Sequence, residues 1–140
     1  MADIDFQGGF FEFNDGAALR DLSAQVLSIR GLPGVTDLRE VTAMSDTTGR
    51  RFGYGLQNTQ FTGEFKMTDG ANEAWAVLRA ARVAKATRAW SRGPAGNAAT
   101  KVKLSGNALV VSMVETGRVN ETATFEATFQ VDAGVTEGTY

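Results

Sequence analysis

Two glutamates on neighbouring predicted strands are the residues whose types best suit catalysis. Glu64 and Glu126 each occupy the polar side of an alternating segment, so their carboxylates can face one another across a sheet. Glycosidases use such a pair for acid and base catalysis, but polar strand faces also carry glutamate without any chemistry. The chain has no histidine and no cysteine, which excludes imidazole relays, thiolate nucleophiles and thiolate zinc sites. The sequence therefore favours a protein that is not an enzyme, and we expect neither a metal nor a cofactor.

A group of basic residues near a tryptophan has the residue types for binding nucleic acid, through phosphate contacts and base stacking on Trp90. Its members are Arg79, Arg82, Lys85, Arg88 and Arg92. Arg79 and Arg82 are also ordinary residues for the C-terminal part of a helix. The net charge of −2 argues against a protein whose main task is to hold DNA.

The charges are unevenly distributed along the chain. No acidic residue lies between Ala74 and Val114, whereas the segments before and after this stretch are mainly acidic. Two interpretations remain open. The acidic ends can fold across the basic middle of the same chain, or the two kinds of surface can meet between copies. The basic residues named above are the candidates for such a charged interface.

Hydrophobic periodicity predicts a mainly β fold with one helix. Residues 59–68 and 119–131 alternate strictly between apolar and polar side chains, as half-buried strands do. Further strands are expected over 35–44, 86–92 and 101–115, and a helix over 71–84 with Ala74, Trp75, Leu78 and Ala81 on its apolar side. Residues 19–32 fit either a helix or a strand, and the strand would need a bulge between Val26 and Leu27. Small domains of this kind form a β-barrel or a β-sandwich of two packed antiparallel sheets.

The N-terminal segment is rich in phenylalanine and glycine. It holds Phe6, Phe10, Phe11 and Phe13, and a stretch this short cannot bury four rings against itself. The rings pack either on their own domain or on a neighbouring copy. We interpret residues 1–18 as an arm that contacts another subunit, followed by one β domain over 19–140.

A stretch with three glycines follows the predicted strand at 35–44 and is predicted to be a long loop. Loops of this length without their own structure are usually functional or disordered. The candidate interface residues within it are Asp46, Thr47, Thr48, Gly49, Arg50, Arg51, Phe52, Gly53 and Tyr54.

The chain length of 140 residues suits a single domain. The first residues lack the basic and apolar regions of a secretory signal, and no run approaches the length that a membrane span needs. We therefore expect a soluble protein, made in the cytoplasm, with no membrane contact.

The order of several short motifs resembles one protein family. These motifs are Asp21-Leu22-Ser23-Ala24, Gly31-Leu32-Pro33-Gly34, Leu38–Ala43, Leu56–Gly63, Gly93-Pro94-Ala95-Gly96, Lys103-Leu104-Ser105-Gly106 and Phe125–Thr139. Together they span most of residues 21–140, and the series resembles the major tail tube proteins of long-tailed, non-contractile bacteriophages and their relatives in gene-transfer particles. For the N-terminal phenylalanines this family offers no counterpart.

The resemblance implies packed β-sheets flanked by a helix, with residues 22–29 in a strand. It also implies copies that self-assemble into stacked hexameric rings, forming the virion's tail tube for DNA ejection. The loop at 46–54 would reach a neighbouring subunit or ring, and Glu64 and Glu126 would face the lumen. Tape measure, terminator and baseplate or hub proteins would be partners. The alternatives are a tail terminator or neck connector ring, and a small β-barrel module that binds nucleic acid through residues 79–92.

Overall fold

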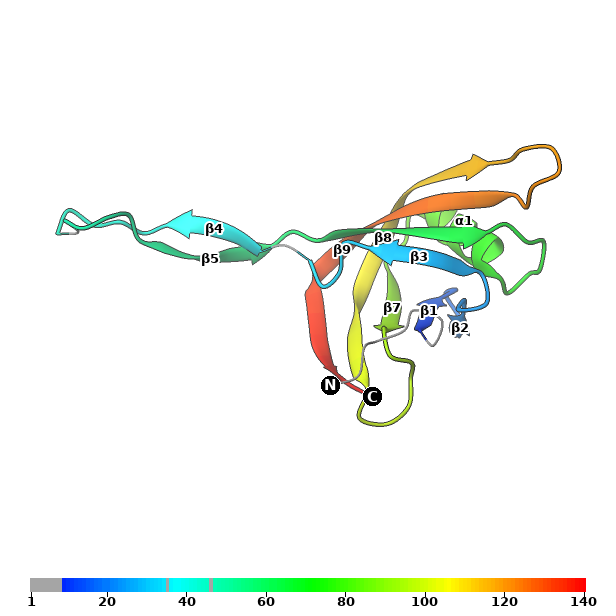
Figure 1. The fold of residues 1–140 in the computed structure, drawn as a ribbon, viewed down its shortest axis with the longest axis horizontal. Coiled ribbons are helices and arrows are strands. Elements are labelled where there is room, and N and C mark those ends of the chain that lie inside the picture. The colour runs from blue at the N-terminus through cyan, green and yellow to red at the C-terminus, as the bar shows by residue number, and fades with distance from the viewer. Residues whose placement is uncertain (1–8, 35, 46) are drawn as a thin grey trace.

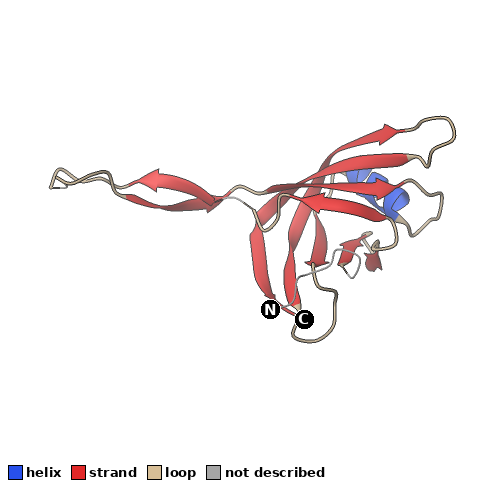
Figure 2. Cartoon of the chain, in the orientation of Figure 1, coloured by secondary structure: helices blue, strands red, loops and turns tan. Residues whose placement is uncertain are grey.

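The computed structural model describes residues 9–34, 36–45 and 47–140. Two antiparallel sheets and one helix make up the chain (Figure 1; Figure 2). The elements are β1 (Phe10–Asn14), β2 (Leu19–Asp21), β3 (Val26–Arg30), β4 (Thr36–Glu40), β5 (Phe52–Gln57), β6 (Gln60–Lys66), α1 (Ala74–Ala84), β7 (Arg88–Gly93), β8 (Val102–Thr116) and β9 (Thr124–Thr139). The mainly β fold with one helix is thus confirmed.

The larger sheet has seven strands in the order β2-β1-β7-β8-β9-β6-β3, and it curls until its two halves face each other. Phe11 on β1 lies 6.0 Å from Phe65 on β6, between ring centroids, although three strands separate β1 from β6 in the sheet. The packed layers therefore belong to one continuous sheet, while the smaller sheet is the β4–β5 hairpin, which extends away from this body (Figure 1).

Aromatic residues from β1, β6, β7 and β9 fill the space inside the curl. Phe61 and Phe129 are cross-strand partners whose rings stack with centroids 4.5 Å apart, and Phe65 and Phe125 stack in the same way at 5.2 Å. Gly63 lies between these pairs, and a Cβ there would come within 2.7 Å of the Phe65 ring. The strict alternation of residues 59–68 thus places every second side chain in the core, as predicted.

Helix α1 packs on this core through Ala74, Val77, Leu78 and Ala81. Trp75, which the sequence placed on the apolar side, is only half-buried. Its ring forms a T-shaped pair with the Phe125 ring, with 5.1 Å between the centroids. The helix begins at Ala74 rather than at residue 71, and Lys85 ends it in the left-handed conformation (φ 53°). Its amide contacts the carbonyl oxygens of Ala81 and Arg82, as a helix C-cap does.

Within the described residues 9–18, the segment that we predicted as an arm belongs to the larger sheet of its own chain. Phe11 and Phe13 are fully buried, and β1 is hydrogen-bonded between β2 and β7. Phe10 is half-buried and packs edge-on against Tyr140, with centroids 6.0 Å apart, and Phe6 lies outside the described residues. The rings turn inward because their own domain offers the apolar surface. The predicted boundary between residues 18 and 19 accordingly separates two paired strands of one sheet.

Residues 19–32 contain two strands and no helix. The resemblance implied a strand over residues 22–29, and only residues 26–29 of that range lie in one. The two strands are β2 and β3, which a turn over residues 23–25 separates. The pairing of β3 with β6 shifts register between Val26 and Ser28, which confirms the bulge expected there. Within β3, Ile29 then points to the core and Arg30 to the outer face.

Candidate functional site

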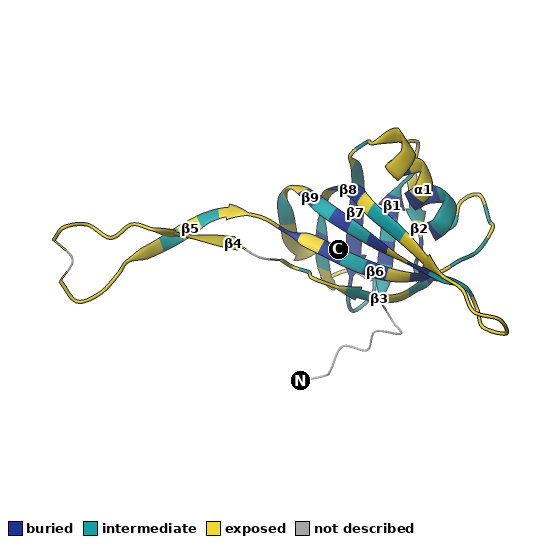
Figure 3. Ribbon diagram, turned by 90° about the horizontal axis from the view of Figure 1, so that it is seen from above, coloured by how far each residue is buried: buried dark blue, intermediate teal, exposed yellow. Residues whose placement is uncertain are grey.

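The β4–β5 hairpin carries several exposed large apolar side chains on a ribbon that leaves the body (Figure 3). Leu38 and Tyr54 are opposite one another in the pairing register, and Phe52 lies two residues from Tyr54, so the three share one face. Their exposed fractions are 68%, 83% and 56%. An apolar face without cover on its own chain is a surface for binding another protein.

The hairpin corrects the predicted loop at residues 46–54. Phe52, Gly53 and Tyr54 belong to β5, while Thr47, Thr48, Gly49, Arg50 and Arg51 connect the two strands. Pairing continues past the strand ends, since the Val41 amide donates to the Arg51 carbonyl oxygen at 2.8 Å and the Arg51 amide donates to Thr42 Oγ1 at 2.9 Å. Gly53 and Gly55 lie between Phe52, Tyr54 and Leu56, and glycine is uncommon in strands, which is why the sequence indicated a loop. Asp46 lies outside the described residues.

The base of the hairpin is fixed to the body by hydrogen bonds from β9. The Val135 amide donates to Gln57 Oε1 at 2.9 Å, and the Val131 amide donates to the Thr59 carbonyl oxygen at 2.9 Å. Before β4, Gly34 has φ 124° and lies against the buried Thr59, so a Cβ there would collide with the threonine side chain. A cavity of about 430 Å³ lies at this junction, lined by Leu56, Gln57, Ala133, Gly134 and Val135.

Glu64 and Glu126 are direct cross-strand partners on β6 and β9, as their positions in the sequence predicted. Both are exposed on the outer face of the sheet, opposite to the phenylalanines. Arg30 on β3 contacts Glu126, with 3.1 Å between Nη2 and Oε1. The arrangement is a solvated polar surface, and among the described residues no group of three or more acidic side chains could hold a metal ion.

The five basic candidates do not form one surface. Arg79, Arg82 and Lys85 are exposed on α1 and its C-cap, and Arg88 is half-buried. Arg92 is 8% exposed, its Nη1 donates to the Phe10 carbonyl oxygen at 3.4 Å, and burial lowers the pKa of its guanidinium. Trp90 is 2% exposed and contacts Phe61 in the core. Base stacking on Trp90 and phosphate contacts by Arg92 are therefore blocked, which corrects their assignment to an interface.

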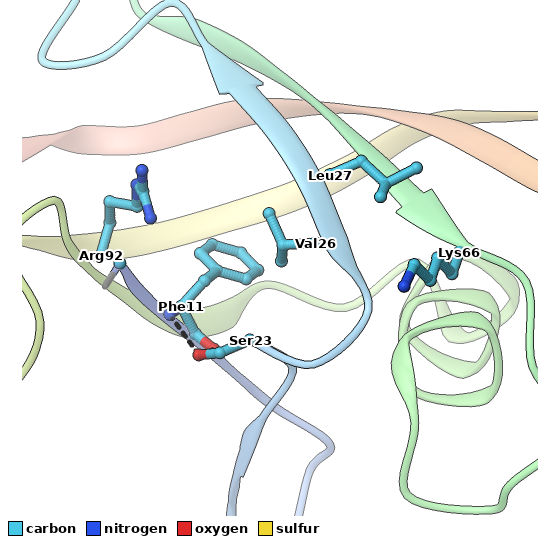
Figure 4. Close-up of a pocket in the computed structure, with 7 residues that line it drawn as sticks. Phe11, Ser23, Val26, Leu27, Lys66 and Arg92 are labelled. Carbon is cyan, nitrogen blue, oxygen red and sulfur yellow. Dashed lines mark hydrogen bonds between the residues drawn. The ribbon is translucent and has the colours of Figure 1, made fainter. Parts of the chain in front are cut away.

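Arg92 also lines a cavity of about 380 Å³ between β1 and β3, shown in Figure 4. Phe11 lies in it between Arg92 and Val26, with Lys66 at the far side, and the Phe11 amide donates to Ser23 Oγ at 2.9 Å. No carboxylate is among the described residues that line this cavity, so it lacks an acid–base pair.

Sequence reasoning missed a polar cluster on the outer face near the C-terminal residue. Ser91 Oγ donates to Glu12 Oε1 at 2.8 Å and lies 3.3 Å from Tyr140 Oη, while Lys103 Nζ lies 5.2 Å from the centre of the Tyr140 ring. Burial raises the pKa of the Tyr140 phenol. The contacts tie β1, β7 and β9 together. Only the alternation of Phe11, Glu12 and Phe13 hinted that Glu12 would face outward.

No helix in the described part of the chain is long and apolar enough to cross a membrane. No family model matches the chain, and no curated protein matches it.

Solved structures do resemble the chain. The SPP1 tail tube matches with a TM-score of 0.76 at 17% identity, over 99% of this chain and 80% of that one. The tail of an empty gene transfer agent particle, refined with C6 symmetry, matches with a TM-score of 0.72 at 13% identity, over 98% of this chain and 99% of that one. A chain of the anti-feeding prophage baseplate, six-fold symmetrised, matches with a TM-score of 0.67 at 9% identity, over 99% of this chain and 97% of that one. The chain therefore has the fold of tail tube proteins, the family that its sequence motifs resemble.

Proposed function

We propose that this protein is a structural subunit of the tail tube of a phage or gene-transfer particle and has no catalytic role. Its copies assemble into hexameric rings that stack into a tube within the virion tail, through which DNA leaves the particle. Support comes from a fold that matches tail tube structures over 98–99% of the chain, one of them refined with C6 symmetry.

The observation that carries the proposal is the projecting hairpin with one uncovered apolar face. Leu38, Phe52 and Tyr54 are more than half exposed in the part of the chain that the structure describes, and exposed apolar surface of this kind is costly unless another molecule buries it. Each ring of copies would supply hairpins to the next subunit or ring. Because the hairpin and its receptor are different patches of one chain, the contact is heterologous and can propagate.

The outer face of β6 and β9 suits the wall of a DNA conduit. It carries threonine, glutamine, Lys66 and the cross-strand pair Glu64 and Glu126. Carboxylates repel phosphates, and a wall that does not bind phosphate lets DNA slide. We assign these two glutamates to the lumen and expect the tube to pass DNA without sequence-specific contacts.

A second candidate is a ring at one end of the tube, such as a terminator or connector. The likeness to a chain in the structure of the anti-feeding prophage baseplate supports this candidate. In either role the other tail proteins, namely tape measure, terminator and baseplate or hub, would be the partners.

Negative-stain electron microscopy of the purified protein, over a series of concentrations, distinguishes these functions. We expect uniform hollow tubes or stacked rings whose number grows with concentration. Single rings that never stack would favour the second candidate. Monodisperse small particles at every concentration, also after addition of preformed tail baseplates as initiators, would contradict both.

A further inference from the structure

The outward face of α1 is a basic patch without acidic partners. Arg79, Arg82 and Val83 lie three and four residues apart, so they share one side of the helix, opposite to its buried face. All three are exposed, and Val83 is 60% exposed. Lys85 adds a further exposed cation at the C-cap. None of these cations pairs with a carboxylate in the described part of the chain.

Unpaired like charges on one helix face are unfavourable. Arginines three residues apart repel one another, and the chain places no carboxylate between Ala74 and Val114 to relieve this. The basic patch is therefore a surface that an acidic partner would stabilise, and its exposed valine provides an apolar centre for the contact.

The turn between β8 and β9 has the complementary composition. Glu115 near the end of β8 and Glu121 in the turn are both exposed, and neither forms a salt bridge within the described residues. Val119 lies between them in the sequence and is 89% exposed. Arg118 is the one cation of this turn, so its net charge stays negative. Like the patch on α1, the turn combines charged residues with one exposed valine.

We infer that the outward face of α1 in one copy binds the β8–β9 turn of a neighbouring copy. The inference rests on the proposed function and specifies its lateral contact. Both surfaces lie at the end of the molecule opposite the β4–β5 hairpin, so they can meet between copies that stand side by side with their long axes parallel (Figure 1). Because the two patches differ, the contact is heterologous and repeats around a ring.

The other exposed acidic residues fit this role less well. Glu126 already contacts Arg30, and it shares the outer face of the sheet with Glu64. Glu40 on the hairpin lies 3.8 Å from Arg50, and the hairpin carries further arginines. The β8–β9 turn combines carboxylates that form no salt bridge within the described residues with an exposed apolar centre.

Charge reversal tests the contact with two complementary variants. Variant A carries Arg79→Glu and Arg82→Glu on α1, and variant B carries Glu115→Lys and Glu121→Lys on the turn. In A alone or B alone, every such contact joins like charges, so assembly should need about a tenfold higher concentration than the wild type. In an equal mixture, A and B can alternate around a ring with an even number of subunits, because each contact then joins opposite charges.

The expected result is that the mixture assembles at nearly the wild-type concentration while A and B alone do not. A single chain with all four substitutions should assemble as well, since its patches again match. Lys101→Glu serves as a control, because it reverses one exposed cation elsewhere and should leave assembly unchanged. Circular dichroism should show native folding for all variants, whose altered side chains are exposed.

Two outcomes separate this inference from the proposed function. If the wild type forms tubes and A and B form them equally well, the α1 contact is wrong while the tube function stands. If the wild type forms no tubes, the proposed function fails, and native mass spectrometry still tests the contact between two copies. A complex in the A and B mixture, but in neither alone, supports the contact, and its absence overturns it.

Discussion

At the scale of single residues, Phe13 tests whether the N-terminal segment belongs to the core. The ring is fully buried and lies 5.6 Å from Phe129, between centroids. Phe13→Ala should lower the free energy of unfolding by about 3–5 kcal/mol, because truncation removes buried apolar area and leaves a cavity. Urea denaturation of the monomer measures this loss. Phe10→Ala is the matched control, since Phe10 is only half-buried and should cost clearly less. If both variants lost equally little free energy of unfolding, Phe13 would not be a core residue, and the sequence-based prediction of an arm would stand for it.

Asp15 makes the stability of the β1–β2 turn depend on pH. The amides of Ala18 and Ala17 donate to its Oδ1, each at 2.9 Å, and Arg20 Nε lies 2.7 Å from its Oδ2. The Ala18 amide, then the Arg20 guanidinium and the Ala17 amide, hold the pKa of this carboxyl well below its ordinary value of 3.8. The unfolded chain therefore takes up the proton first as the pH falls.

The sign of the effect follows from this lowered pKa. The stabilisation by Asp15 is complete above the ordinary pKa of 3.8 and is lost as the pH falls from there toward the folded-state pKa. Asp15→Asn should thus be less stable than the wild type at neutral pH, with a difference that shrinks below about pH 4. Thermal unfolding at a series of pH values measures the difference. A gap that stayed constant down to pH 2 (about two units below the ordinary pKa) would contradict the assignment.

At the scale of elements, the β4–β5 hairpin should be needed for assembly and not for folding. Phe52→Ala combined with Tyr54→Ala removes the exposed aromatic part of its apolar face. Surface substitutions of this kind change the free energy of unfolding by about 0.5 kcal/mol or less, so the monomer should melt almost as the wild type does. Assembly, followed by sedimentation, should fall strongly. Arg39→Ala alters the opposite face of the same ribbon and should have a smaller effect. A large fall in melting temperature for the double variant would place the two rings in a core.

The junction at Gly34 should control how firmly the hairpin is held. Alanine there combines a positive φ with a collision against Thr59, and each effect alone is unfavourable. We expect Gly34→Ala to cost more than about 1 kcal/mol and to make the hairpin more sensitive to limited proteolysis. Gly49→Ala is the control, because nothing lies within 4 Å of the added Cβ and the residue has no positive φ. Equal proteolysis of both variants would show that Gly34 does not hold the hairpin.

Elements with a regular period could be predicted from the sequence, and the others could not. Residues 60–66 and 124–131 alternate because one side of each strand faces the aromatic core, so both strands were found. The last strand begins at Thr124 rather than at residue 119 and extends to Thr139. The hairpin was predicted as a loop because of its glycines, since Gly53 and Gly55 stand between Phe52, Tyr54 and Leu56 and glycine is depleted in strands. Phe11 and Phe13 alternate with Glu12, but Phe10 beside them concealed the pattern. The cavity between β1 and β3 brings together residues distant in sequence, which periodicity does not reveal.

At the scale of the whole molecule, the proposed tube combines two kinds of contact with different responses to salt. The hairpin contact is mainly apolar, so a salt that is excluded from protein surfaces, such as a sulfate, should strengthen it. The contact of α1 with the β8–β9 turn is between exposed charges, and ions screen it over about 3 Å at molar ionic strength. Binding of DNA through phosphates would instead weaken steeply with any salt.

Ammonium sulfate and sodium chloride at matched ionic strength therefore separate the contributions. Both salts should weaken the charged contact alike, so the difference between them reports the apolar one. We expect more sedimentable tube in sulfate than in chloride, and we expect the advantage of sulfate to disappear in the variant with Phe52→Ala and Tyr54→Ala. The mixture of charge-reversed chains should keep that advantage, because its hairpins are intact. Assembly that fell equally in both salts would mean that charge alone holds the copies together, and the apolar face of the hairpin would then need another partner.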